Sequence, residues 1–295
     1  MSSASATTEG GPSSARSLGF EVMGVVNVTP DSFSDGGRYL DARAAVAHGV
    51  ELAREGAAIL DIGGESTRPG AAPVGIAEEL HRVIPVIEGL TDAATPARVS
   101  IDTSKVAVAA EAVAAGASLV NDVTAFRGDP GMAAFVAEAG LDCSLMHMLG
   151  DPRSMQDDPR YDDVVSEVKA FLEARLAFAV AAGVAEQRVM LDPGIGFGKT
   201  LEHNLELLRR LDELVAIGRP VLIGTSRKSF LGRLTGREDP SEREAGTVAT
   251  NVLAYLRGAR VFRVHDVGPV YDALLVTAAT VTTPWATTSP RSSTK

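Results

Sequence analysis

The sequence predicts a single (β/α)₈ barrel, and three observations carry that prediction. Eight short apolar runs of strand length alternate with eight helical patterns along the chain. The runs are apolar throughout, as expected for strands of a parallel sheet that are buried on both faces. Nearly every run ends in a polar or ionisable residue. A closed barrel gathers those residues on one face, whereas the alternative, a doubly wound open sheet, spreads them along an edge.

The eight apolar runs define the expected strands and, at their ends, the expected site. The strands are predicted at residues 21–28, 57–62, 98–101, 118–120, 142–146, 188–191, 220–223 and 261–264. Their carboxyl ends carry Asn27, Asp61, Asp102, Asn121, His147, Asp192, Ser226 and His265. Ligands of such barrels bind at the carboxyl ends of the strands, so these positions outline the expected site.

The helical patterns follow the strands and carry recognisable start and stop signals. They are predicted at about residues 41–55, 77–90, 104–115, 130–138, 161–182, from 201 onward, 241–257 and 268–279. Asp41 and Ser104 are expected to cap two of these helices, and Ser241 with Glu244 has the spacing of a capping box. Gly56 and Gly116 are expected to end the first and third helices.

The composition indicates where in the cell the protein acts and which partners are unfavourable. The predicted domain spans residues 19–281, and the Ser-, Ala- and Thr-rich stretches 1–18 and 282–295 are expected to be disordered. The first stretch lacks the apolar core of a signal peptide, and no apolar run is long enough to span a membrane. Cys143 is the only cysteine, which excludes a disulfide within the chain and fits a cytoplasmic enzyme. The formal charge of -10 argues against a nucleic-acid partner.

The most distinctive stretch is VMLDPGIGFGKT at residues 189–200, where a strand runs into a glycine-rich turn and a helix. It is not a P-loop, because Pro193 stands five positions before Gly198 where that motif needs glycine. It is not a dinucleotide fingerprint either, because the third glycine comes one residue too early. The carboxylate of Asp192, at the end of the strand, is therefore expected to meet a different ligand.

Two carboxylates and one amide form the first candidate group. Asp102, Asn121 and Asp192 end three strands and can hydrogen-bond a flat heterocycle with several N–H groups. The alternative is that each caps the following helix, as Asp often does. Three such residues with no adjacent basic residue in the sequence favour the ligand.

Basic residues at the last two strands form the second candidate group. The segment 226–229, SRKS, opens a helix after the seventh strand, where backbone N–H groups favour an anion; the alternative is a solvated turn. Arg263 and His265 lie two apart on a strand, share a face and can clamp a phosphate. The alternative is that Arg263 is buried against a nearby acid such as Asp266.

Two long loops and one amide complete the predicted mouth. The loops at residues 29–40 and 63–75 are long for mere connectors, which favours binding loops, with Asp35 and Arg68 among their charged members. Asn27 can offer a neutral oxygen to Mg²⁺, which takes few protein ligands beside phosphate and water. A diphosphate leaving group fits the combination of the carboxylates in the first candidate group with the basic residues in the second.

The motifs at these positions resemble those of the bacterial dihydropteroate synthases, over residues 23–276. They are GVVNVTPDSFSDGG (24–37), DIGGESTRPGA (61–71), SIDTSK (100–105), VNDV (120–123), MHM (146–148), LDPGIGFGK (191–199), GTSRKSF (224–230) and FRVHDV (262–267). The resemblance implies a barrel, usually dimeric, that joins 6-hydroxymethyl-7,8-dihydropterin diphosphate to 4-aminobenzoate with release of diphosphate. A pterin-binding methyltransferase and a non-catalytic pterin-binding paralogue are the alternatives, and the intact loops and SRK motif disfavour both.

The resemblance also implies roles for individual residues. The pterin is expected at Asp102, Asn121, Met146, Asp192, Phe197, Gly224 and Lys228. The diphosphate is expected at Thr67, Arg68, Arg263 and His265, and the aminobenzoate at Phe33, Pro69 and Ser229. Mg²⁺ is expected at Asn27, and Asp35 and Lys228 are the expected catalytic residues.

Overall fold

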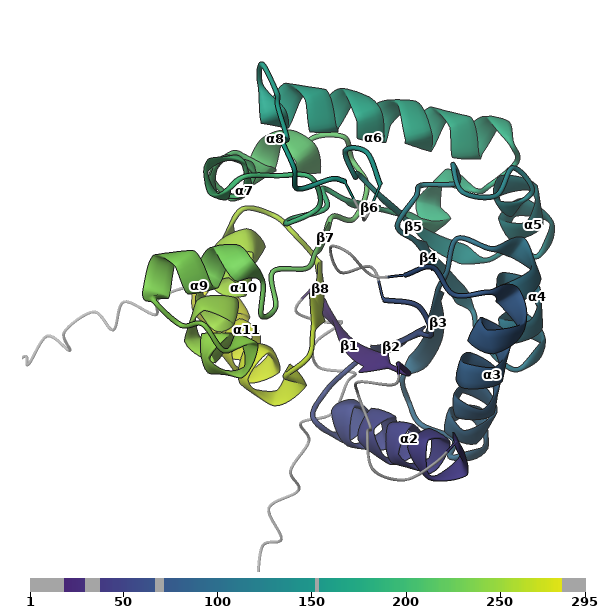
Figure 1. The fold of residues 1–295 in the computed structure, drawn as a ribbon. Coiled ribbons are helices and arrows are strands. Elements are labelled where there is room, and N and C mark those ends of the chain that lie inside the picture. Colours follow the sequence, from purple (N-terminus) through teal and green to yellow (C-terminus); the bar gives the residue numbers. More distant parts are fainter. Residues whose placement is uncertain (1–18, 30–37, 67–71, 152–153, 283–295) are drawn as a thin grey trace, which may run out of the picture.

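A computed structural model describes residues 19–29, 38–66, 72–151 and 154–282, without the side chains of residues 38–41. Its centre is one sheet of eight parallel strands surrounded by helices (Figure 1). The strands are β1 (Glu21–Asn27), β2 (Ile59–Gly63), β3 (Arg98–Asp102), β4 (Leu119–Asp122), β5 (Asp142–Met146), β6 (Val189–Asp192), β7 (Leu222–Ile223) and β8 (Val261–Val264). The predicted (β/α)₈ barrel is confirmed.

The strand order shows how the barrel closes. Neighbouring strands pair in the order β6-β5-β4-β3-β2-β1-β8-β7, so β1 lies between β2 and β8. A single parallel bridge between Leu191 and Val221 joins the two ends of the sheet, next to β6 and β7. All eight strands therefore point their carboxyl ends toward one face.

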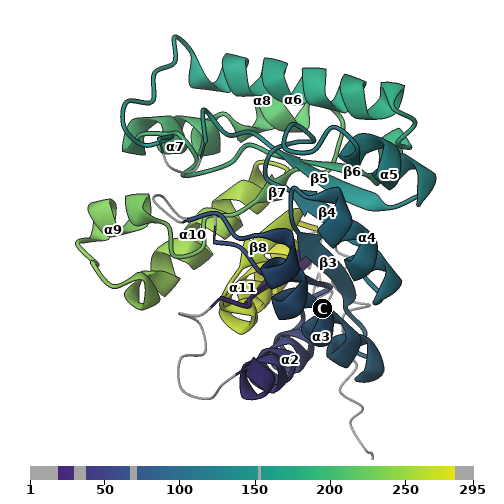
Figure 2. The ribbon, with the colours of Figure 1, turned by 45° about the vertical axis from the view of Figure 1, so that its right-hand side comes forward.

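The helices form a ring around the strands. They are α2 (Arg38–Arg54), α3 (Ile76–Asp92), α4 (Val106–Ala114), α5 (Met132–Glu138), α6 (Val164–Ala181), α7 (Leu201–Arg209), α8 (Leu211–Val215), α9 (Ser229–Thr235), α10 (Glu244–Leu256) and α11 (Val267–Thr282). Figure 2 shows α6 lying across the outside of β5 and β6, with α10 and α11 side by side near β8. In the described part of the chain, no helix is both long and apolar enough to cross a membrane.

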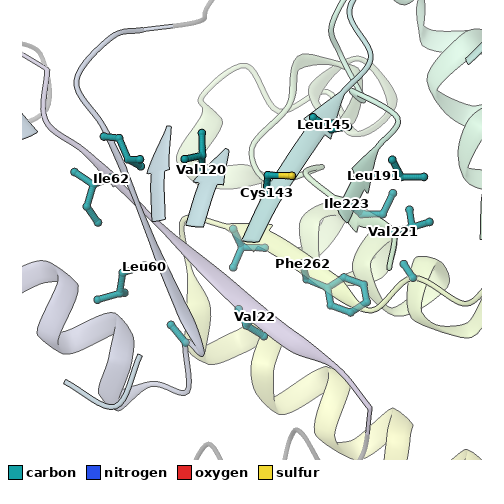
Figure 3. Close-up of a cluster of buried hydrophobic side chains, with 14 of the residues drawn as sticks. Val22, Leu60, Ile62, Val120, Cys143, Leu145, Leu191, Val221, Ile223 and Phe262 are labelled. Atoms are coloured by element: carbon teal, nitrogen blue, oxygen red, sulfur yellow. The ribbon is translucent and has the colours of Figure 1, made fainter. Parts of the chain in front are cut away.

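Two apolar layers hold the barrel together. The outward faces of the strands pack against the helices in one large buried cluster, part of which is drawn in Figure 3, with Leu60, Val120, Leu145 and Phe262 among its members. A smaller buried cluster fills the barrel interior with Met23, Ile59, Leu119, Met190, Leu222 and Val261. Each such side chain stabilises the fold by about 1.5–3 kcal/mol when fully buried. This inner cluster lies beneath the polar residues at the carboxyl ends of the strands.

Several predicted helix starts are wrong. The segment α2 begins at Arg38, so Asp41 lies inside it. The N-cap of α4 is Lys105 rather than Ser104, and the distant Asp129 accepts a hydrogen bond from Val106 N at 3.1 Å. Ser241 does not cap a helix either. It lies inside a 3₁₀ turn, Pro240–Arg243, which is capped by Asp239, and α10 starts only at Glu244.

Candidate active site

Strand register places the predicted ligand groups in two rows at the carboxyl ends of the strands. Asn27 is paired with Gly63, Gly63 with Asp102, and Asp102 with Asn121 across β1 to β4. On the other side of the mouth, Met146 is the register partner of Asp192. Register partners on adjacent parallel strands lie side by side, so Asn27, Gly63, Asp102 and Asn121 form one row. Asn121 pairs onward with Ser144, so Met146 and Asp192 lie two residues farther along their strands. We call the side chains of these two rows the floor of the site.

Arg263 is held against this floor by two carboxylates. Its Nε donates to Asp61 Oδ2 at 2.7 Å and its Nη2 donates to Asp102 Oδ2 at 2.9 Å. The alternative that Arg263 pairs with an acid is therefore confirmed, but Asp266 as the partner is wrong, because Asp266 pairs with Arg227 through two hydrogen bonds of 3.0 and 2.6 Å. A basic side chain thus lies directly against the acidic floor, although none is adjacent in the sequence.

Asp61 is a site residue whose role the sequence reasoning missed. It is fully buried and accepts hydrogen bonds from Ser100 Oγ at 2.6 Å and from Asn121 Nδ2 at 3.0 Å, besides the one from Arg263. It therefore orients both Asn121 and Arg263. The amide orientation leaves Asn121 Oδ1 as the atom that can accept from a ligand N–H. Its position at the end of a strand was the only available signal.

Burial dominates the electrostatics of the floor. It raises the pKa of Asp102 to about 7, although the charge of Arg263 acts in the opposite direction. Burial also raises the pKa of Asp192, against the Gly194 N–H and the nearby lysine and arginine charges. Burial opposes the positive charge of Arg263, but Asp61 and Asp102 outweigh it and raise the pKa of that side chain.

The loop after β6 is shaped by close backbone packing. Asp192 Oδ1 accepts a hydrogen bond from Gly194 N at 2.7 Å. Gly194 has φ of +66°, and a Cβ at this position would lie 1.9 Å from the carbonyl oxygen of His147. Only glycine fits both the left-handed backbone and this approach. The loop is thereby pressed against the end of β5.

Phe197 and Lys228 bring the loops after β6 and β7 together. Lys228 Nζ lies 4.0 Å from the centroid of the Phe197 ring, a cation–π contact. Phe197 also packs against the buried cluster of Met146, Met148 and Met155. Methionine side chains adapt to flat apolar surfaces, so this cluster with the Phe197 ring can form the walls of a slot for a planar ligand.

His265 is a half-buried, neutral imidazole. Its backbone N–H donates to Ser226 Oγ at 3.1 Å, and Ser226 Oγ lies 2.9 Å from His265 Nδ1. The Ser226 hydroxyl can donate to Nδ1 or accept from it, since its oxygen has a second lone pair. Burial lowers the pKa of His265 to about 3, helped by Arg263. The ring therefore donates a proton to hydrogen bonds without carrying charge.

Two of the remaining predicted site residues lie in the described part of the chain, and the others do not. Gly224 follows β7, and a Cβ built on it would lie 4.0 Å from Arg263 Cβ. Ser229 is the first residue of α9, directly after Lys228. The predicted residues on the two long loops, Phe33, Asp35, Thr67, Arg68 and Pro69, lie outside the described residues.

The buried carboxylates, the apolar surface of Met146 and Phe197, and the cations Arg263 and Lys228 together suit an enzyme that binds a flat nitrogen heterocycle bearing an anion. The model of a family described as pterin binding enzyme matches residues 23–265. The chain therefore belongs to the family of pterin-binding enzymes.

Its relatives within that family are dihydropteroate synthases, and the chain groups with them. It is 51% identical to the one of Mycobacterium leprae, over 88% of this chain and 93% of the relative. The Xanthomonas albilineans dihydropteroate synthase with 4-aminobenzoic acid has a TM-score of 0.85 at 53% identity, covering 90% of this chain and 95% of that one. A complex of that organism's enzyme with 7,8-dihydropteroate has a TM-score of 0.81 at 50% identity, covering 90% and 94%.

Proposed function

We propose that this chain condenses 6-hydroxymethyl-7,8-dihydropterin diphosphate with 4-aminobenzoate to give 7,8-dihydropteroate and diphosphate, a step of folate biosynthesis. The observation that carries the proposal is Arg263, a cation held against the carboxylates of Asp61 and Asp102. It brings a group for the leaving diphosphate to the edge of a floor for the pterin. The solved relatives with 4-aminobenzoic acid and with 7,8-dihydropteroate support the choice of substrate and product.

The floor would hold the pterin by its hydrogen-bonding edge. Asp102, Asn121 and Asp192 offer oxygens to the amino and ring N–H groups. Met146 and Phe197 would cover the ring faces, and Lys228 would donate to the ring from beside Phe197. Gly224 leaves room next to Arg263 for the ring. Buried polar groups that a ligand satisfies discriminate strongly against analogues that lack the matching N–H.

The chemistry is a substitution at the methylene carbon. The C–O bond to the diphosphate breaks, and its electron pair leaves with the diphosphate, whose oxygens accept hydrogen bonds from Arg263 and His265. The positive charge left on the methylene spreads into the pterin ring, where the carboxylates of Asp102 and Asp192 stabilise it. The amine nitrogen of 4-aminobenzoate forms the new C–N bond and then loses a proton, so little help from a base is needed.

The residues at the barrel mouth fit a magnesium ion bound mainly by the substrate. A Cβ built on Gly63 would have Asp102 Oδ2 at 3.7 Å and Asn27 Oδ1 at 3.9 Å, so the two oxygens flank one point. Among the described residues, no group of three or more His, Cys, Asp or Glu side chains could hold a metal ion. Mg²⁺ with one protein oxygen and several from diphosphate and water matches that donor set. When bound there, the ion would neutralise charge on the diphosphate.

The two long loops and Ser229 would complete the site. We assign Thr67 and Arg68 to the diphosphate, and Asp35 to a closing interaction over the bound substrates. Phe33, Pro69 and Ser229 would frame the 4-aminobenzoate. Asp35 and Lys228 are the proposed catalytic residues. We also propose that the enzyme is a cytoplasmic homodimer.

The test is a turnover assay with the purified chain, dihydropterin diphosphate, 4-aminobenzoate and Mg²⁺, with released diphosphate and dihydropteroate both measured. Equal amounts of the two products, formed only when both substrates are present, are expected. A sulfonamide that mimics 4-aminobenzoate should compete with it. Pterin binding without diphosphate release would show a non-catalytic paralogue, and methyl transfer from a methylated pterin to a corrinoid protein would show a methyltransferase.

A further inference from the structure

Lys199 is a buried cation that the mechanism above does not use. Its side chain is only 3% exposed, on the glycine-rich loop after β6. Its Nζ lies 2.9 Å from Phe197 O and 2.9 Å from His147 Nδ1. In the described part of the chain, it forms no ion pair with a carboxylate. Burying an ammonium group with neutral acceptors alone costs free energy, so its presence points to a role beyond stability.

We propose that Lys199 is a positioning residue of the pterin pocket, which fixes Phe197 in place and supplies positive charge to Asp192. This inference rests on the proposed function. Lys199 binds Phe197 at its carbonyl oxygen, and Lys228 lies 4.0 Å from the centroid of its ring. Lys199 thus contacts the backbone of Phe197, and Lys228 contacts its ring. Without the first contact, the Phe197 backbone would keep its hydrogen bond from N to Gly194 O at 3.0 Å but would lose the one at its carbonyl oxygen.

His147 links the same ammonium to the end of β5. Its backbone N–H donates to Asp192 O at 2.9 Å, and its ring packs edge-on against Phe171 with centroids 4.8 Å apart. Burial lowers the pKa of His147 to about 2, so the ring is neutral and Nδ1 keeps a lone pair for Lys199. Lys199 therefore joins the loop after β6 to the strand that carries Met146.

The charge of Lys199 acts on the floor as well. Burial lowers the pKa of Lys199 to about 7, opposed by the charge of Asp192 and reinforced by that of Lys228. The lysine charge in turn helps to lower the pKa of Asp192, which burial raises. Tyr161, the other titratable group packed here, donates its hydroxyl to Gly198 O at 2.8 Å. Loss of the lysine proton at alkaline pH removes the charge that favours an ionised Asp192 and weakens the hold on Phe197.

The experiment compares three variants with the parent chain. Lys199→Met keeps the length and removes the charge, Lys199→Arg keeps the charge, and Lys169→Met on α6 is the matched control outside the site. The KM values for the pterin substrate and for 4-aminobenzoate are measured separately. We expect Lys199→Met to raise the pterin KM by about tenfold or more, as loss of a hydrogen bond to a charged group does, and to leave the aminobenzoate KM within about twofold. Lys199→Arg should rescue part of the loss, and Lys169→Met should match the parent.

A pH profile keeps the inference testable even if Lys199→Met folds poorly. In the parent chain, kcat/KM for the pterin should fall on the alkaline side, and Lys199→Arg, which cannot lose its proton, should lose that fall. An unchanged pterin KM in Lys199→Met, equal rises in both KM values, or an alkaline fall that persists in Lys199→Arg overturns the inference. Failure of the parent chain to form product overturns the proposed function instead.

Discussion

Arg263 donates a hydrogen bond from Nη2 to Asp102 Oδ2 at 2.9 Å, which joins the residue proposed for the diphosphate to one proposed for the pterin. In the free chain the arginine charge is balanced by Asp102 and by the buried Asp61. A pterin that binds Asp102 through its N–H groups competes for the same carboxylate. Under the proposed function, binding of the ring would leave more of the Arg263 charge for the departing diphosphate, and the two halves of the substrate would be recognised together.

Arg263→Met should lower turnover and stability together. Loss of one preorganised donor to a developing negative charge typically lowers kcat by about 100- to 1,000-fold. Removing one partner of a buried ion pair also costs about 3–5 kcal/mol of unfolding free energy, because two buried carboxylates lose their counter-charge. Diphosphate release and urea unfolding measure the two effects. Arg209→Met is the control, since its pair with Glu206 is largely exposed and should be worth at most about 1 kcal/mol. Turnover equal to that of the parent would remove Arg263 from the mechanism.

The pterin kcat/KM should rise with pH on the acid side. Burial raises the pKa of Asp102 to about 7, and only the carboxylate form stabilises the pterin cation. The pKa of Asp102 in the folded chain lies above its unfolded value of 3.8, so protonated Asp102 favours the folded state. This contribution to the free energy of unfolding is present at low pH and is lost as the pH rises through about 7. Activity and stability therefore change in opposite directions over this range. The measurement is a pH–rate profile of the parent and of Asp102→Asn, which should lack the acid limb; an acid limb that stays in Asp102→Asn contradicts the assignment.

Gly194→Ala should be far more costly than Gly140→Ala. Both glycines have left-handed backbones, with φ of +66° and +62°. A Cβ at Gly194 would lie 1.9 Å from His147 O, whereas nothing lies within 4 Å of one at Gly140. The control carries only the backbone cost of about 1–2 kcal/mol, and Gly194→Ala adds about 1–3 kcal/mol for the overlap. Urea unfolding of both variants measures the loss of unfolding free energy. Equal losses in the two variants would show that the backbone at His147 moves away from the new Cβ without cost.

Turnover should depend on Mg²⁺ through Asn27. Treatment with a chelator should abolish turnover, and added Mg²⁺ should restore it. Asn27→Ala removes the proposed neutral oxygen and should raise the Mg²⁺ concentration for half-maximal rate by about tenfold. Asn27→Asp keeps an oxygen at the same place and serves as the control. Full turnover in excess chelator would exclude the metal from the reaction.

The strands were predictable because their apolar runs reflect burial on both faces, a local property of the sequence. The exception is β7, predicted from Pro220 but formed only by Leu222–Ile223. Pro220 has no N–H to donate, and its carbonyl accepts a single hydrogen bond from Leu191 N at 2.9 Å. The helix starts failed where a distant group decides the cap, as Asp129 does for α4.

The gathering of the strand-end residues was predictable, whereas the hydrogen bonds between their side chains were not. The ends of parallel strands meet by topology, so Asp102, Asn121 and Asp192 could be grouped without a structure. The partners of Arg263 could not, because Asp102 and Asp61 stand 161 and 202 positions away in the chain, whereas the nearby Asp266 binds Arg227. Such pairs depend on which side chains a closed barrel brings together, and no local pattern records that.

The most direct test of the site is a crystal structure of this chain with 7,8-dihydropteroate. The edge of the pterin ring should lie against Asp102, Asn121 and Asp192, with its faces covered by Met146 and Phe197 and with Lys228 hydrogen-bonded to the ring. The methylene should point toward Arg263. A pterin bound away from these carboxylates, or one whose methylene faces away from Arg263, would contradict the account.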